Sequence, residues 1–482
     1  MDVNLHALLP ELVLTLAICG VIGIDLFLPD WLRWTLMPLA FLGVLATLGA
    51  VLILPDLPVE TLGGMFVVDK FAVLFKVVFC LAGLVVFVIS SDYLKEDDIH
   101  RGEYYSMLLC SLLGMLTIAS SRDLIPIFVA LETITLPAIV LAGIRKHDLR
   151  SNEAALKFFL FSVLSTALML FGMSLIYGIT GSTNLADISA ALTGRSDLTE
   201  IAVLSVFFII VGFGFKISVF PFQWWVPDTY EGAPVPIAAF LSVASKTAGF
   251  VGLFLVMFLG LAPLADVWRP LFGILGVVTI TFGNLVAIQQ RNIVRLLAYS
   301  SIAQAGYMLL PLGVTSATNA EDINSSILFA SISYLLIYAF MEYGAFSSAI
   351  AVGRQGGSYL IKDYAGLFSR SPVLAMSLTA FLLSLAGIPP FAGWWAKFVV
   401  FGVLIEGGGV WLAAAMAVNT VIALFYYVMI IKRMVVDRPE ATEPIKMPVK
   451  LGGVIAMAAV VVLVLGLVPD TVGRLASDLS FF

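Results

Sequence analysis

The chain has 482 residues, of which 61% are hydrophobic and only 12% are charged, and its mean hydropathy is +1.05. A water-soluble domain is closer to half apolar and a quarter charged, so this composition indicates a membrane protein with many spans. The net charge of −6 is modest and gives no reason to expect a nucleic-acid partner.

Apolar runs of about 20 residues, long enough to cross a bilayer as helices, follow one another along the chain. The first run, LVLTLAICGVIGIDLFL, has neither a basic segment before it nor a small-residue cleavage site after it, so we expect a retained span rather than a signal peptide. The longest loops, 179–198 and 432–448, leave no room for an extramembrane domain. The expected fold is therefore an all-α polytopic membrane protein with about fourteen transmembrane helices, near residues 7–28, 34–54, 68–91, 103–120, 123–144, 152–178, 199–229, 235–261, 267–289, 293–312, 323–352, 372–404, 409–431 and 449–469.

The basic residues of the loops favour a topology with both termini on the non-cytoplasmic side, because cytoplasmic loops carry an excess of Lys and Arg. In that topology 4 basic residues face the outside, namely Arg122, Arg195, Arg269 and Arg474, whereas 16 face the cytoplasm. The sixteen are Arg33, Lys95, Arg101, Arg145, Lys146, Arg150, Arg291, Arg295, Arg354, Lys362, Arg370, Lys432, Arg433, Arg438, Lys446 and Lys450. A span count that differed by one would mix the two groups, so the bias also supports an even number of spans.

Charged residues inside the apolar runs are candidates for a function, because each costs about 2.5–3.5 kcal/mol to insert into a membrane. All six basic residues there are lysines: Lys70, Lys76, Lys157, Lys216, Lys246 and Lys397. Arginine stays protonated at any accessible pH, whereas burial favours the neutral form of lysine, so lysine suits a carrier of protons. The acidic residues in the runs are Glu11, Asp25, Glu132 and Glu342, with Asp69 and Glu153 near the ends of runs.

The position of a charge within its run separates two interpretations. Snorkelling or a structural ion pair is favoured for residues that are isolated or near the end of a span, here Lys70, Lys76, Asp69 and Asp25. A function is favoured for the mid-span residues, here Glu132, Lys216, Lys246 and Lys397. A buried lysine without a partner is costly, so Glu132 is a natural counter-ion for a lysine inside the membrane.

Two spans are expected to be interrupted by prolines. The stretch FPFQWWVP at residues 220–227 follows Lys216, and the stretch IPPFAGWWAKF at residues 388–398 includes Lys397. Proline removes a helix hydrogen bond, and irregular backbone inside a membrane is tolerated only where protein covers it or a wet cavity adjoins it. Breaks at corresponding places of two halves indicate an internal repeat with a functional site at the breaks. A simple proline kink is the alternative, but it does not explain why a lysine recurs.

The sequence contains no pattern typical of a cofactor or metal site. There is no glycine-rich phosphate loop, no CxxC and no HExxH. The three cysteines, Cys19, Cys80 and Cys110, lack the spacing of metal ligands and are expected to be packing residues. The three histidines, His6, His100 and His147, lie at the predicted ends of spans and do not form a haem-type pair.

Five segments carry a resemblance to a known family: ALETITLPAIVLAG, KFFLFSVLSTALMLFGMSLIYGITGS, GFGFKISVFPFQWWVPDTYEGAPVPIAAFLSVASKTAGF, RLLAYSSIAQAGYML and SLAGIPPFAGWWAKF. Through them essentially the whole chain resembles the antiporter-like membrane subunits of proton-pumping NADH:quinone oxidoreductase, which is respiratory complex I. Within that family it is most similar to the subunit N branch, on its start LLPELVLTLAICGVIGIDLFLP, its length and Lys397, where some sister subunits carry glutamate.

The resemblance implies two inverted five-helix repeats, each of which contains a broken helix. It divides the chain into three N-terminal helices at 1–102, a first repeat at 103–261, a second repeat at 267–435, and a last helix with its tail at 449–482. It also implies that this chain holds no cofactor of its own, and that FMN, iron–sulfur clusters and quinone belong to partner subunits.

The resemblance implies a role in proton translocation for five residues. Glu132 corresponds to a fifth-helix glutamate that modulates Lys216, the lysine of the first broken helix. Lys246 corresponds to a bridging lysine of the eighth helix, and Lys397 to the lysine of the second broken helix. Lys157 matches a sixth-helix lysine near the pair of Glu132 and Lys216.

The expected function is proton translocation through this buried Glu/Lys axis, driven by redox chemistry in partner subunits. The expected partners are other membrane subunits of complex I, including sister antiporter-like subunits, in a bacterial inner membrane. Glu342 matches no role in the family, and both a local hydrogen-bonding role and a place in the hydrated axis stay open.

Three rival functions share part of the evidence. A subunit of an Mrp-type cation/proton antiporter, or of a related hydrogenase or plastoquinone-linked complex, would contain the same broken helices, and copurifying proteins would distinguish it. A structural scaffold is disfavoured because it would gain stability by losing the six lysines, which look unpaired in the sequence. A stand-alone solute transporter is disfavoured because no substrate-shaped polar cluster accompanies the charged axis.

Overall fold

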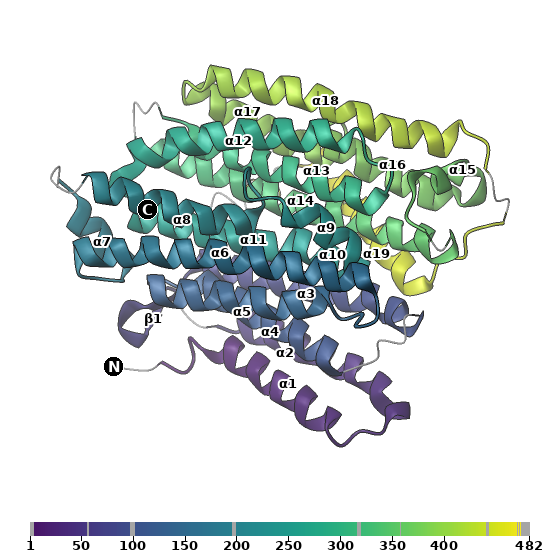
Figure 1. Ribbon diagram of the computed structural model, residues 1–482, viewed down its shortest axis with the longest axis horizontal. Helices are drawn as coiled ribbons and strands as arrows, with labels where there is room; N and C mark the ends of the chain where they lie inside the picture. Colours follow the sequence, from purple (N-terminus) through teal and green to yellow (C-terminus); the bar gives the residue numbers. More distant parts are fainter. Residues whose placement is uncertain are drawn as a thin grey trace. The chain divides into compact units, whose positions relative to one another are not determined.

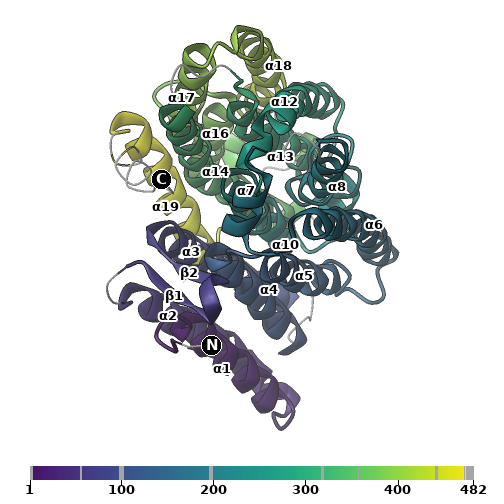
Figure 2. The ribbon, with the colours of Figure 1, turned by 90° about the vertical axis from the view of Figure 1, so that its left-hand side faces the viewer.

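Apolar helices account for nearly all of the chain in a computed structural model that describes residues 4–54, 57–96, 102–194, 199–315, 320–356, 358–439, 443–469, 471 and 473 (Figure 1). Two units are distinguished, one built from Met1–Ile217 with Gly232–Trp268 and the other from Ser218–Glu231 with Arg269–Ser480. We call them the N-terminal unit and the C-terminal unit. Within each unit the long helices run side by side, and Figure 2 shows them nearly end-on.

The described residues of the N-terminal unit form eight long helical segments and a small hairpin. Its elements are α1 (Leu9–Asp25), η1 (Asp30–Thr35), α2 (Leu36–Leu52), β1 (Val59–Thr61), η2 (Leu62–Gly64), β2 (Phe66–Val68), α3 (Lys70–Glu96), α4 (Gly102–Ser120), α5 (Leu124–Ala142), α6 (Leu149–Thr180), α7 (Leu185–Leu192), α8 (Thr199–Ile217), α10 (Val235–Phe240), η3 (Leu241–Ser245), α11 (Lys246–Phe254), η4 (Leu255–Gly260) and η5 (Ala262–Leu264). The last long segment, from α10 to η4, is one continuous helix in which η3 and η4 are π-helical.

The C-terminal unit begins with the short helix after the first break and continues to the last span. Its elements are α9 (Trp225–Gly232), α12 (Ala265–Ala287), α13 (Ile293–Leu309), η6 (Leu310–Gly313), α14 (Ala320–Gly356), η7 (Ile361–Tyr364), α15 (Leu367–Arg370), α16 (Pro372–Ala386), α17 (Ala392–Glu406), α18 (Val410–Val435) and α19 (Val449–Leu467). Helix α14 packs against α16, α17 and α19, and therefore forms the centre of this unit.

The predicted polytopic all-α fold is confirmed. Twelve of the described helices are long and apolar enough to cross a membrane. The other two predicted spans are α1, which is 17 residues long, and the interrupted pair α16 and α17, with 15 residues each. Each predicted span thus has a helical counterpart, and the two spans predicted to be broken are broken.

Polar residues at the loop ends fix where several helices begin. The side chains of Asp123, Asp148 and Asn292 accept hydrogen bonds from the backbone N–H groups of the first helical turn of α5, α6 and α13. Those N–H groups have no partner within the helix, so a capping oxygen stabilises the start. The helix α6 is capped at its end by Gly181, whose φ of 74° is easily adopted only by glycine.

Hydrogen bonds and an ion pair hold neighbouring segments together at each end of the N-terminal unit. At one end Arg145 and the backbone N–H of Val235 both donate to the hydroxyl of Tyr93. At the other end Arg122 pairs with Asp69 at 2.5 Å, and the N–H of Leu185 donates to the carbonyl oxygen of Arg122. The three segments at each end are those that the charge count assigns to one side of the membrane.

Two small elements lie where loops were predicted. The strands β1 and β2 pair antiparallel with Val59 opposite Val68. The helix α7 falls inside the predicted loop 179–198, is capped by Asn184, and buries Leu185, Ile188 and Leu192 on one face. Its spacing of i, i+3 and i+7 is typical of an amphipathic helix, but eight residues are too few to stand out beside the long spans.

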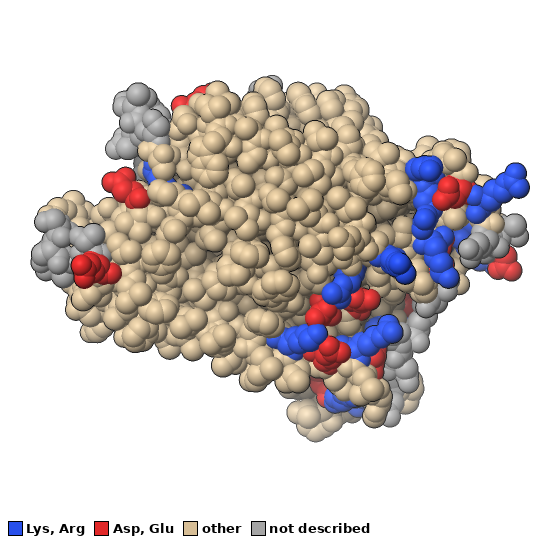
Figure 3. All heavy atoms as spheres, turned by 45° about the horizontal axis from the view of Figure 1, so that its top comes forward, with Lys and Arg blue, Asp and Glu red and all other residues tan. Residues whose placement is uncertain are grey.

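The outer surface is apolar over wide areas. Figure 3 shows that most of the visible surface carries neither basic nor acidic side chains and that the charged side chains lie in small groups. On α18, for example, Val418, Val421 and Phe425 are 61%, 69% and 55% exposed. Apolar side chains exposed along a helix of this length are typical of a surface that faces lipid, so the chain is an integral membrane protein.

Candidate functional site: two broken helices with buried lysines

The first break follows α8. This helix ends at Ile217, Ser218 has a φ of 67°, the Phe220–Pro221 peptide bond is cis, and the chain becomes helical again at Trp225. Because proline has no N–H and cannot continue the preceding helix, the carbonyl groups at the end of α8 have no helical partner. A helix end of this kind carries a partial negative charge.

Lys216 lies in that last turn of α8 and is only 5% exposed. Its Nζ donates a hydrogen bond to Oγ1 of Thr135 on α5 at 2.7 Å, and the Thr135 hydroxyl donates to the carbonyl oxygen of Leu131 at 2.6 Å. The helix α11 approaches the stem of the lysine closely at Gly249, where a Cβ atom would lie 2.9 Å from Cγ of Lys216. The ammonium group is therefore held by a hydroxyl group of α5, and α11 packs tightly against the stem of the lysine.

Glu132 lies one turn before Thr135 on α5 and is half-buried. Its Oε1 accepts a hydrogen bond from Oγ1 of Thr166 on α6 at 2.9 Å. Among the described residues, Lys216 forms no ion pair with Glu132, and its hydrogen-bond partner is Thr135 instead. Glu132 is nevertheless near enough to attract the ammonium group of Lys216 electrostatically.

Lys246 is buried, with 1% of its surface exposed, in the long helix from α10 to η4. It is the first residue after the π-helical segment η3, and a second π-helical segment, η4, begins nine residues later. π-Helical turns are rare and are often found at functional sites. They shift the register of a helix, which the apolar sequence pattern alone does not predict.

The other lysines of the spans differ in their surroundings. Lys157 pairs with Glu153 on the same helix at 2.7 Å, and its side chain is 38% exposed. Lys70 is exposed at the first residue of α3. Lys76 is completely buried, pairs with Glu11 at 2.7 Å, and lies 5.0 Å from the ring centre of Phe66.

These surroundings correct the view that all six lysines are buried and unpaired. Lys76 is in an ion pair, and Lys70 and Lys157 reach the surface. The ion-pair interpretation also fits Asp69, which pairs with Arg122, and Asp25, which lies 3.6 Å from Arg33.

The second break separates α16 from α17. It contains Gly387 with a φ of 87°, the cis Pro389–Pro390 bond, and a helix start at Ala392. Only glycine adopts the conformation of Gly387 without strain, and a Cβ there would also lie 2.7 Å from Cδ of Lys397. The break therefore requires glycine for the backbone and for the approach of the lysine.

Lys397 is 6% exposed and bridges the second break. Its Nζ donates to the carbonyl oxygens of Leu385 and Ala386, at 3.1 Å and 3.0 Å, which are the last carbonyl groups of α16. The same Nζ lies 4.5 Å from the ring centre of Tyr307 on α13. A helix end and an aromatic face both stabilise a cation, so this site can hold a protonated lysine without a carboxylate.

The two half-helices meet at Gly393. Its N–H donates to Oγ of Ser384 at 2.9 Å, and a Cβ at this position would lie only 1.8 Å from the carbonyl oxygen of Ser384. The start of α17 is thereby fixed against the end of α16, which keeps Lys397 within reach of the free carbonyl groups.

A buried polar network surrounds the second lysine and was not predicted from the sequence. Gln304 donates to the carbonyl oxygen of Leu385 at 3.2 Å and accepts from the hydroxyl of Tyr334 at 2.5 Å. Asn284 donates to the hydroxyl of Tyr307 at 3.3 Å and accepts from that of Tyr426 at 3.1 Å. Amides and tyrosines in apolar spans are the only sequence signal for such a network.

Glu342 is completely buried on α14 in the C-terminal unit. It lies near enough to Tyr427 to act on it electrostatically, and the hydroxyl of Tyr427 is 2.5 Å from Oγ of Ser300. The structure therefore places Glu342 near Tyr427, whose ring centre lies 4.3 Å from that of Tyr426 in the network around the second lysine.

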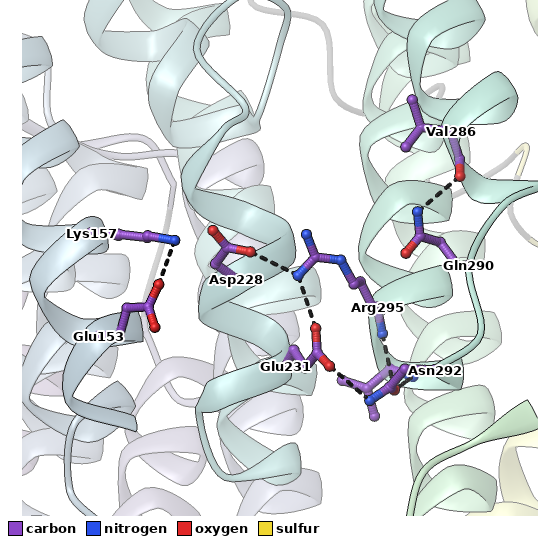
Figure 4. A network of polar contacts seen from close by, with 9 residues as sticks. Glu153, Lys157, Asp228, Glu231, Val286, Gln290, Asn292 and Arg295 are labelled. Atoms are coloured by element: carbon purple, nitrogen blue, oxygen red, sulfur yellow. Dashed lines mark hydrogen bonds and ion pairs between the residues drawn. The ribbon is translucent and has the colours of Figure 1, made fainter. Parts of the chain in front are cut away.

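An ion-pair network holds α9 against α13. The guanidinium group of Arg295 lies between Asp228 at 2.7 Å and Glu231 at 2.8 Å, and Glu231 also accepts from Nδ2 of Asn292 at 3.2 Å (Figure 4). Two carboxylates on one arginine fix the orientation of the short helix that follows the first break.

Among the residues that the structure describes, no group of three or more His, Cys, Asp or Glu side chains could hold a metal ion.

Comparison with known proteins gives a consistent result. A family model described as "NADH:quinone oxidoreductase/Mrp antiporter, TM" matches residues 121–423. NADH-quinone oxidoreductase subunit N of Moorella thermoacetica is 38% identical over 99% of both chains, and F(420)H(2) dehydrogenase subunit N of Methanosarcina mazei is 38% identical over 97% of both chains. In the structure of respiratory complex I from Thermus thermophilus with bound Aureothin, one chain is 29% identical, with a TM-score of 0.78, and 97% of this chain aligns with 99% of that chain.

These matches extend over both broken helices and nearly the whole length of the chain. The family model ends within α18, and the full-length relatives cover the N-terminal helices and α19 as well. The chain therefore belongs to the family of NADH:quinone oxidoreductase and Mrp antiporter transmembrane proteins.

Proposed function

We propose that this chain is a proton-translocating membrane subunit of an NADH:quinone oxidoreductase and that Glu132, Lys216, Lys246 and Lys397 carry the protons. One observation supports this most: each broken helix places a buried lysine at the carboxyl end of its first half. Burying an ammonium group is costly, and an apolar residue of similar size would pack more favourably. A lysine in this position is better explained by transport than by packing.

The first site can work as a switch. Lys216 donates to Thr135, and Glu132, one turn away on the same helix, accepts from Thr166 instead of from the lysine. Transfer of the ammonium group from Thr135 to Glu132 would form the ion pair, and release would make the lysine proton available. A charge arriving from a neighbouring subunit would shift this equilibrium, and carrying one charge across the membrane costs about 2.3 kcal/mol per 100 mV.

The second site holds its lysine differently. Lys397 donates to backbone carbonyl groups and lies over Tyr307, so no carboxylate has to move when it gains or loses a proton. Its proton can leave along the hydroxyl groups of Tyr307, Tyr334 and Tyr426. These tyrosines form hydrogen bonds with the amide groups of Gln304 and Asn284. Lys157, being partly exposed and paired with Glu153, would act at the edge of the first site.

The setting of this function is part of the proposal. The partners would be other membrane subunits of the complex, including sister antiporter-like subunits, and flavin, iron–sulfur clusters and quinone would belong to partner subunits. Both termini would lie on the non-cytoplasmic side of a bacterial inner membrane. The repeats would cover residues 103–261 and 267–435, with a broken helix in each.

Proton pumping by single and double variants tests the first site. Glu132→Gln and Lys216→Met are each expected to lower quinone-linked proton pumping strongly in membrane vesicles, relative to the amount of assembled complex. The double variant is expected to lose less than the two single losses together, because residues of one network are coupled. Strictly additive losses would show that Glu132 and Lys216 act independently.

A second candidate is a related complex with another electron donor, because one relative is named F(420)H(2) dehydrogenase subunit N at 38% identity. The membrane chemistry would be the same and the soluble partners would differ. Extraction in mild detergent followed by identification of the bound subunits decides between them. Copurification with antiporter subunits alone would instead favour an Mrp-type antiporter.

A further inference from the structure

The C-terminal unit contains a cavity of about 610 Å³ whose basic residues take no part in the proposed proton pathway. It lies where α12 ends, α13 begins and α18 reaches its last turns, and Leu360 and the start of η7 complete its wall. Its described lining includes three basic residues, Arg291, Lys362 and Arg433, and no acidic residue. The cavity is therefore positively charged and lies at the ends of membrane-spanning helices.

The walls of the cavity change from apolar to basic along the helices. On α18 the lining residues Phe425, Met429 and Arg433 follow one another at intervals of four residues, so they form one stripe on the helix. Phe425 and Met429 are 55% and 48% exposed, and both lie within the candidate membrane span Val410–Val435. The opposite wall repeats the pattern, because Ile288, 39% exposed, precedes Arg291.

The inner wall of the cavity is buried. Leu296, Tyr426 and Ile430 line it and are 2%, 3% and 1% exposed. The cavity is thus a recess in the packed unit, and a bound molecule would contact fixed side chains. Arg433 shares its guanidinium group with Asp437 at 3.5 Å, and both side chains stay more than a third exposed, so the arginine can still meet a ligand.

We propose that this cavity binds the headgroup of an anionic phospholipid. The phosphate would lie among Arg291, Lys362 and Arg433, and an acyl chain would lie along Phe425 and Met429. Arginine pairs with phosphate through two parallel hydrogen bonds, and basic pockets between helix ends are sites for anionic headgroups. A free anion would gain nothing from the apolar stripe, whereas an amphiphile matches both parts of the wall.

Photolabelling of the intact complex in nanodiscs tests the site. The probes are a photoactivatable phosphatidylglycerol and its phosphatidylcholine counterpart, each at a small fraction in phosphatidylcholine, with the labelled peptides identified by mass spectrometry. We expect the phosphatidylglycerol probe to label peptides that contain residues 425–433 or 288–291 several-fold more than the neutral probe. Because each cation near a membrane surface strengthens anionic-lipid binding by about fivefold, Arg291→Gln/Arg433→Gln should lower this labelling roughly tenfold or more.

Matched controls make the result decisive. Lys432→Gln/Arg438→Gln removes two exposed cations close in sequence that do not line the cavity, and should leave the labelling unchanged. Equal labelling by both probes, or an equal loss in both double variants, would overturn the proposal. Loss of labelling when inorganic phosphate is added would indicate a free-anion site, and no labelling of either peptide would indicate that a partner subunit covers this surface. Variants are compared only at equal amounts of assembled complex.

Discussion

The two broken helices resemble each other in backbone and differ in where the lysine comes from. In each, the first half-helix is followed by a residue with positive φ, Ser218 or Gly387, and three residues later by a cis proline, Pro221 or Pro390. Lys216 belongs to the half-helix that ends at the first break. The second lysine belongs to the half-helix that begins after the break and reaches back across it.

This difference determines what kind of partner each lysine has. Lys216 donates to the side-chain hydroxyl of Thr135, which can be exchanged for the nearby carboxylate of Glu132. Lys397 donates to the carbonyl oxygens of Leu385 and Ala386, which are fixed by the end of α16. The contact of Lys216 with a side-chain hydroxyl can therefore be exchanged for another partner, whereas the backbone contacts of Lys397 keep its ammonium group in one position.

The largest effect is expected from a substitution that pushes apart the two half-helices of the second break. In Gly393→Ala the new Cβ would meet the carbonyl oxygen of Ser384 at 1.8 Å, so the two half-helices would have to separate. We expect destabilisation by about 3 kcal/mol or more, measured as the amount and thermal stability of the assembled complex. Gly402→Ala on the same helix has no atom within 4 Å of the new Cβ and should behave like the wild type. Normal assembly of the Gly393 variant would contradict the close approach of α16 and α17.

A smaller effect is expected from changing the cation at the second break. Lys397→Arg keeps the positive charge but cannot release a proton, because the pKa of the arginine guanidinium group lies far above any accessible pH. We expect its proton pumping to fall by more than about tenfold, to the level of Lys397→Met, with both variants normalised to assembled complex. If the arginine variant pumps like the wild type, Lys397 only balances the end of α16 and carries no proton.

The smallest effect is expected from removal of the side-chain acceptor of Lys216, a change that has no counterpart at the second break. Thr135→Val keeps the shape of the side chain and removes the acceptor of Lys216, whose unsatisfied donor should cost about 1–3 kcal/mol. We expect pumping to fall about three- to tenfold, because the lysine then pairs with Glu132 more persistently. No such variant exists for Lys397, since its acceptors are backbone atoms.

A neighbouring threonine provides the control for this variant. The hydroxyl of Thr133, on the same helix, donates to the carbonyl oxygen of Val129 and contacts no lysine among its described hydrogen bonds. Thr133→Val should pump normally. Equal effects of the two valine variants would show that α5 tolerates neither change and that the contact of Thr135 with Lys216 has no special role.

Much of the fold could be predicted because membrane insertion leaves a simple signal. Long apolar runs gave the spans, and the prolines at 221 and 389–390 gave the two breaks, since both effects are local in sequence. The short helix α7 was missed because its amphipathic pattern covers only eight residues. The π-helical turns beside Lys246 were missed because a change of helical register depends on packing.

The sequence by itself determined the membrane-spanning fold, the two interruptions and the lysines beside them, because apolar length, proline chemistry and the cost of a buried charge belong to single segments. Only the tertiary structure decided which partner each lysine has. Thr135 replaced the expected carboxylate, Lys76 found Glu11 on another helix, and Lys397 turned back to α16. A hydrogen bond between helices depends on their rotation and distance to within about an ångström, and that information is distributed over all the contacts of the packed unit.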